Sequence, residues 1–97
     1  MTRIVVCGEA LVDLVPGGRS TDTRVSQWRA LAGGGPFNTA VALARLGAEV
    51  QFVGRLGGDS FGAQVRSHLE ANGVGTRLSH TTEEATSLAV VSLDEEG

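Results

Sequence analysis

Residues 33–38 carry the side chains best suited to binding a ligand, in the sequence Gly-Gly-Gly-Pro-Phe-Asn. They begin a segment with helical periodicity, and a helix N-terminus presents unpaired backbone N–H groups at a positive dipole end. Glycine lets a ligand approach that backbone closely. The amide of Asn38 can donate and accept hydrogen bonds, as recognition of neutral hydroxyl groups requires, although it could also be a plain surface residue. The segment therefore predicts a binding site.

Two aspartates follow predicted strands. Asp13 comes soon after an apolar strand at 3–8, and Asp59 follows a second strand at 50–54 and two glycines. Because ligands of parallel α/β sheets bind beyond the carboxyl ends of the strands, we expect both aspartates near the glycine run. An ionised Asp13 would accept hydrogen bonds from paired hydroxyl groups. The alternatives are a solvated loop residue for Asp13 and, for Asp59, a tight turn followed by a helix N-cap.

The glycine run does not match the known phosphate-binding loops. No Gly-Lys-Ser/Thr follows it, and Asn38 occupies the position of the third glycine in G-x-G-x-x-G, so a nucleotide site here is disfavoured. The histidines are not spaced as metal ligands, and we predict no metal site. Cys7 is the only cysteine, which excludes a disulfide framework. It lies in an apolar run, and we expect it in the core.

Composition and charge exclude several classes of partner. The 97 residues suffice for one small domain, and a net charge of −3 provides no basic surface for nucleic acid. No apolar stretch approaches the ~20 residues that a membrane span needs. The N-terminus has no signal-peptide pattern, so we expect a cytoplasmic location.

The elements that must position these residues alternate between strand and helix, which indicates an α/β fold with a parallel sheet. The predicted strands are 3–8, buried on both faces, then 50–54 and 87–93; the helices are 36–46 and a second one from Asp59 or Ser60 to Gly73.

A long insertion, residues 9–32, replaces the ~2–6 residues usual between a strand and the next helix. We expect it to act as a lid, with strands at 11–15 and 25–31 separated by a turn at 16–18. Trp28 either anchors this lid or forms a wall over the ligand. The last apolar strand precedes a predicted turn at 94–97 without a partner strand, so we expect the chain to be the N-terminal part of a longer protein.

Three segments together resemble the N-terminal signature of the PfkB (ribokinase-like) carbohydrate kinases. They are Gly8–Asp13 (GEALVD), Ala32–Ala40 (AGGGPFNTA) and Gly54–Gly62 (GRLGGDSFG), and their order and spacing match across nearly the whole chain. The first two look more like fructokinases than ribokinases, which tend to carry Asn two places before the aspartate and Lys after the glycine pair. This chain has Leu11 and Gly35 there.

The resemblance implies an α/β, ribokinase-like parallel-sheet core with a small β-sheet lid, of which this chain is the N-terminal portion. The lid strands would lie within 11–31 and from 86 onward, and in the family lids often pair to make dimers. The resemblance assigns sugar binding to four residues and offers two more as candidates: Asp13, Gly33, Gly34 and Asn38, with Trp28 and Asp59.

The implied activity of the whole protein is ATP-dependent phosphorylation of a sugar hydroxyl, with Mg²⁺. The family's catalytic base and ATP site lie in a C-terminal half, beyond residue 97, so we expect this chain to be inactive alone. The alternative is a non-catalytic sugar-binding or dimerisation fragment, which would fold cooperatively by itself.

Overall fold

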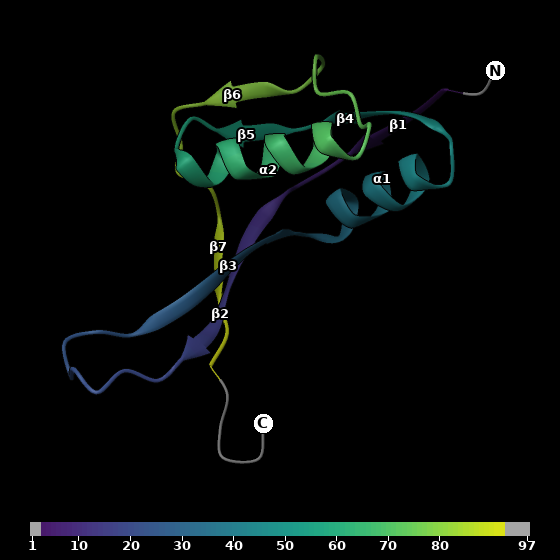
Figure 1. Cartoon of the computed structure of the whole chain (residues 1–97). Coiled ribbons are helices and arrows are strands. Elements are labelled where there is room, and N and C mark those ends of the chain that lie inside the picture. Colours follow the sequence, from purple (N-terminus) through teal and green to yellow (C-terminus); the bar gives the residue numbers. More distant parts are fainter. Residues whose placement is uncertain (1–2, 93–97) are drawn as a thin grey trace.

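The structure, a computed structural model, describes residues 3–92. The strands and helices within them are β1 (Arg3–Cys7), β2 (Leu11–Gly18), β3 (Gln27–Gly33), α1 (Gly35–Arg45), β4 (Glu49–Val53), β5 (Arg55–Gly57), α2 (Ser60–Ala71), β6 (His80–Thr82) and β7 (Leu88–Val90). The strands form three small sheets, ordered β1-β4, β3-β2-β7 and β5-β6 (Figure 1). The predicted α/β class is confirmed, whereas the predicted turn at 94–97 lies outside the described residues.

The core lies between α1, α2 and the sheets. β1 and β4 pair in parallel, from Arg3 beside Glu49 to Cys7 beside Val53. Phe52 of β4 and Phe37 of α1 are the largest fully buried side chains of this core. Because strand side chains alternate between faces, only one face of β4 contributes to it.

Two predictions about the first strand are wrong. β1 is not buried on both faces, and Cys7 is exposed rather than in the core. Ile4 and Val6 pack against the core, but Val5, on the face of Cys7, is 54% exposed. Within residues 3–92 the only helix that packs closely on this sheet is α1, and it covers one face. A continuous apolar run does not reveal how many faces of its strand are covered.

Both helices begin and end close to the start, cap and stop residues that the sequence predicts. α1 starts after Gly34, with a proline in its first turn, and Gly47 follows it at φ +94. Asp59 is the N-cap of α2, and its side chain accepts a hydrogen bond from the N–H of Gly62 (2.8 Å). Gly73, at φ +81, follows its end. Glycine adopts such a φ without strain, which explains both stops.

The predicted lid is a separate sheet that projects from the body (Figure 1). β2 and β3 form an antiparallel arm, and β7 pairs in parallel with the other edge of β2. β7 is shorter than the predicted strand at 87–93 and belongs to this sheet, not to the core. At the root of the arm, the side-chain amide of Gln64 on α2 donates to the carbonyl oxygen of Ala30 (2.8 Å).

The turn predicted at residues 16–18 is wrong, because β2 continues through Gly18. The chain reverses further on, where the N–H of Val25 donates to the carbonyl oxygen of Asp22 (3.0 Å). The strand register shifts between Pro16 and Gly18. β7 pairs with β2 only as far as Leu14, so proline lies where β2 has a single neighbour and its missing N–H is tolerated.

β5 and β6 were not predicted. They pair in parallel from Arg55 beside His80 to Gly57 beside Thr82, and each has three residues, too few for a periodic pattern. Neither helix of residues 3–92 has the length and apolar character that crossing a membrane requires.

Candidate functional site

Asp13 lies near the root of the lid, in the third position of β2. It is half-buried, opposite Leu31 of β3 and beside Ala89 of β7. Leu11 pairs with Gly33, which places Gly33 on the same face as Asp13. A methyl group added at Gly33 would lie 3.1 Å from Oδ2 of Asp13. The structure therefore brings these two residues together, and the missing side chain of Gly33 leaves room beside the carboxylate.

Gly34 and Asn38 continue from this point into α1. Gly34 has φ +111, and a methyl group there would lie 3.2 Å from the carbonyl oxygen of Glu9, so the position requires glycine. Its own carbonyl oxygen accepts a hydrogen bond from the N–H of Asn38 (2.8 Å). Asn38 is an exposed residue in the first turn of α1. The helix has no side-chain cap and no acidic residue in that turn. Its first N–H groups are thus available to a ligand.

These four residues offer a carboxylate, an amide, open backbone and the N–H groups of a helix end. A carboxylate accepts hydrogen bonds from hydroxyl groups, and an amide can donate to or accept from them. Their combination is suited to an uncharged ligand with several hydroxyl groups, as the sequence predicts.

Both carboxylate oxygens of Asp59 are bonded within the chain. Oδ1 accepts from the N–H of Gly62 (2.8 Å) and from the hydroxyl of Thr86 (2.5 Å), and Oδ2 accepts from the N–H of Thr86 (2.8 Å). These bonds, with the Thr86 hydroxyl contributing most, lower the pKa of Asp59 to about 2. The contacts of this carboxylate are those of a helix cap and a link to Thr86.

Trp28 lies on the other face of the lid sheet from Asp13. Side chains alternate along β3, so Trp28 shares a face with Ala30 and Ala32, whereas Asp13 points to the other face. Its indole N–H donates to the hydroxyl of Ser26 (2.8 Å), and the side chain is 42% exposed. The structure does not place Trp28 over the carboxylate of Asp13.

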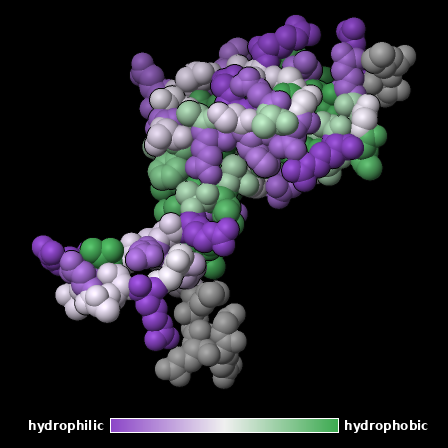
Figure 2. Space-filling model, in the orientation of Figure 1, coloured by the Kyte–Doolittle hydropathy of each residue, from purple (hydrophilic) through white to green (hydrophobic). Residues whose placement is uncertain are grey.

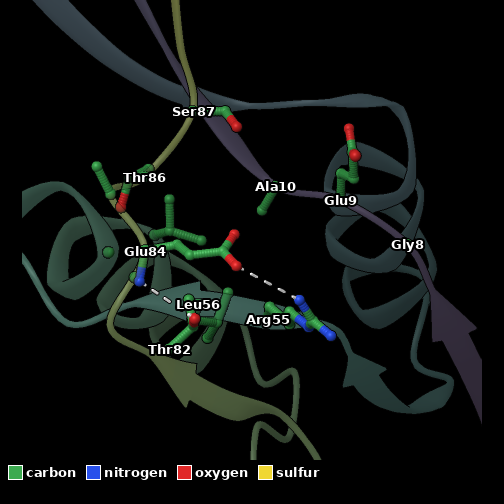
Figure 3. A pocket seen from close by; sticks show the side chains of 13 residues that line it. Gly8, Glu9, Ala10, Arg55, Leu56, Thr82, Glu84, Thr86 and Ser87 are labelled. Atoms are coloured by element: carbon green, nitrogen blue, oxygen red, sulfur yellow. Dashed lines mark hydrogen bonds and ion pairs between the residues drawn. The ribbon is translucent and has the colours of Figure 1, made fainter.

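A cavity of about 320 Å³ lies between the β1–β2 connection, β5 and the segment before β7 (Figure 3). Glu9 and Glu84 lie on opposite sides of it, and Oε1 of Glu84 is 3.8 Å from Nη1 of Arg55. This volume is within the range of pockets for small ligands. None of the four residues described above lines it. Glu9 and Arg55 stand in the sequence motifs, but nothing in their spacing indicated a shared cavity.

Comparison with known proteins identifies relatives along the whole chain. The model of the pfkB family carbohydrate kinases matches residues 1–97. A fructokinase of Vibrio alginolyticus is 41% identical over 98 residues, which cover 100% of this chain and 30% of the relative.

Solved structures agree with that comparison. A fructokinase of Xylella fastidiosa with bound ATP matches with a TM-score of 0.85 and 40% identity, over 94% of this chain and 29% of that one. A double mutant of the fructokinase of Vibrio cholerae, bound to fructose, ADP and potassium ion, matches with a TM-score of 0.80 and 35% identity, over 98% and 29%. The chain thus spans about 30% of the length of the proteins it resembles.

Proposed function

The chain belongs to the pfkB family of carbohydrate kinases, and on this premise we propose that it is the sugar-binding and lid part of a sugar kinase. The whole protein would transfer a phosphoryl group from ATP to a sugar hydroxyl. Its fructokinase relatives favour fructose or a related ketose as the sugar. The observation that supports this best is the close approach of Gly33 to the carboxylate of Asp13, where an added methyl group would lie 3.1 Å from Oδ2.

We assign the sugar contacts to Asp13, Gly33, Gly34 and Asn38. The carboxylate of Asp13 would accept hydrogen bonds from two sugar hydroxyls, and Asn38 would orient a third. The two glycines would let the sugar lie against the backbone at the start of α1. Asp59 is left out, because both of its oxygens are bonded to other residues of the chain.

ATP and Mg²⁺ are proposed for the whole protein, and ATP would supply the phosphoryl group. Among residues 3–92, no group of three or more His, Cys, Asp or Glu lies together in a way that could hold a metal ion. The glycine run also lacks the lysine of a phosphate-binding loop. Because the family resemblance assigns them to a C-terminal half, we propose that both sites, and the catalytic base, lie outside this chain. A cytoplasmic location would suit an enzyme that consumes ATP.

We also propose that the lid pairs with the lid of a second copy. Leu88 and Val90 of β7 are 45% and 61% exposed, and Figure 2 shows hydrophobic surface where the arm leaves the body. Val90→Glu should shift the sedimentation coefficient from dimer to monomer, whereas Leu46→Glu, at an 84% exposed position outside the lid, should not. A wild-type protein that sediments as a monomer would exclude this pairing.

The direct test of the sugar site is Asp13→Asn in the full-length protein, with Asp22→Asn at the arm tip as the control. Loss of about two hydrogen bonds to a charged group predicts a fall of roughly 100-fold in kcat/KM for fructose, with the KM for ATP unchanged. An unchanged kcat/KM would remove Asp13 from the site. A wild-type protein that binds sugar but phosphorylates none would favour the non-catalytic alternative.

A further inference from the structure

Thr86 and Ser87, which precede β7, connect the core to the lid. Thr86 is hydrogen-bonded to the start of α2, and Ser87 is hydrogen-bonded to β2. The N–H and hydroxyl of Thr86 donate to the carboxylate of Asp59 at the start of α2 (2.8 and 2.5 Å). The carbonyl oxygen of the next residue, Ser87, accepts from the N–H of Val12 on β2 (3.0 Å). Val12 immediately precedes Asp13, so a short chain of contacts joins the two aspartates.

The packing around Thr86 fixes this connection in one place. A methyl group added at Gly57 would overlap the hydroxyl oxygen of Thr86, and one added at Gly62 would overlap the carbonyl oxygen of Gly57. β5, the first turn of α2 and Thr86 therefore fit against one another without room for another side chain. Thr86 and Gly57 are half-buried, and a displacement of Thr86 would displace these close neighbours as well.

β7 extends this connection to Asp13, the residue proposed to bind the sugar. It pairs with β2 in register, Val12 beside Leu88 and Asp13 beside Ala89. A shift of Thr86 would move the start of β7, and with it the strand that flanks Asp13. Strands joined by ladder hydrogen bonds move together, because separating them would leave backbone groups unpaired.

We propose that Asp59 is a positioning residue, which sets the place of the Asp13 carboxylate by holding Thr86 at the base of the lid. This role depends on the proposed function, since it assumes that Asp13 binds the sugar. It adds to that function a residue that does not touch the sugar and yet determines how well the sugar binds.

Three substitutions separate positioning from helix capping. Asp59→Asn keeps a good N-cap but leaves one acceptor oxygen, so it cannot accept from both the N–H and the hydroxyl of Thr86 as well as cap the helix. Thr86→Val removes only the hydroxyl, and Thr86→Ser keeps it. Thr82→Val is the matched control, because the hydroxyl of Thr82 accepts only a local bond from the N–H of Glu84 (3.2 Å).

In the full-length protein, Asp59→Asn and Thr86→Val should raise the KM for fructose about tenfold, the scale of one hydrogen bond to a charged group. We expect kcat at saturating fructose and the KM for ATP to stay within about twofold. Hydrogen exchange at the N–H of Val12 should accelerate in both variants. Thr86→Ser and Thr82→Val should match the wild type in all of these measurements.

Two results would overturn the positioning role. One is faster hydrogen exchange at the N–H of Val12 with an unchanged KM for fructose. The other is a lower kcat, a similar rise in the KM for fructose and the KM for ATP, and a lower Tm, which together indicate general destabilisation. If the wild-type protein phosphorylates no sugar, the proposed function fails instead. Titration with fructose then decides the inference: weaker binding in both Asp59→Asn and Thr86→Val, with Thr86→Ser and Thr82→Val binding as the wild type does, supports it, and equal binding in all four refutes it.

Discussion

Gly33→Ala tests whether the space beside Asp13 is used for binding. The added methyl group would lie 3.1 Å from Oδ2 of Asp13, so the carboxylate must move by a few tenths of an ångström. Gly35→Ala provides a matched control two residues away, since a methyl group there meets nothing within 4 Å. Both positions lack a positive φ, and alanine can adopt either backbone conformation.

The displacement should weaken binding more than folding. A shift of a few tenths of an ångström would weaken the hydrogen bonds that the carboxylate accepts from the ligand. Loss of about one such bond amounts to ~1.4 kcal/mol, or tenfold in affinity. Replacing glycine by alanine also restricts the unfolded chain, which stabilises by ~0.4–1 kcal/mol and offsets the crowding at residue 33. Alanine at residue 35 should stabilise α1 slightly.

The assay compares the KM for fructose, the KM for ATP and the Tm of both variants in the full-length protein. We expect a tenfold higher KM for fructose in Gly33→Ala alone, with the KM for ATP unchanged. Equal fructose KM values in the two variants would refute the reasoning. So would a large fall in Tm for Gly33→Ala, because the effect on binding would then follow from loss of structure.

Three further predictions concern the fold. Gly62→Ala should destabilise the protein by ~1–3 kcal/mol or more in a urea titration, since its methyl group would overlap the carbonyl oxygen of Gly57; an unchanged midpoint would contradict this. The pKa of Asp59 is lowered from 3.8 to about 2, so the ionised carboxylate stabilises the folded protein fully above about pH 4, and this stabilisation is lost as the pH falls toward 2. Acid titration of Asp59→Asn should lack this dependence. Cys7, being exposed, should react with a thiol reagent in the folded 97-residue chain; protection until unfolding would restore the predicted core position.

The parts of the fold that could be predicted from the sequence are those decided by local chemistry. Gly34, Asp59 and Gly73 act on their own neighbours, as helix start, cap and stop, so both helices were located to within a residue or two. The presence of strands within residues 11–31 followed from the length of the insertion and from the family resemblance, whereas their role as a lid remains a prediction. The sugar-binding roles of Asp13 and the glycine run remain predictions.

The features that could not be predicted depend on contacts between distant segments. β5 and β6 are strands only because each pairs with the other. The exposed face of Cys7 depends on which elements cover the sheet, and the face of Trp28 depends on the register of β3. The bonds of Asp59 to Thr86 join segments that no spacing rule relates.

The register shift between Pro16 and Gly18 divides the lid arm into two parts whose strand pairing is set separately. Nearer the core, pairs from Leu11 with Gly33 to Val15 with Arg29 keep Asp13 on its face. Beyond the shift, one residue more or fewer in the reversal changes only the tip, because a bulge takes up a change in strand length. The tip can therefore change in length without altering the orientation of the Asp13 carboxylate at the root.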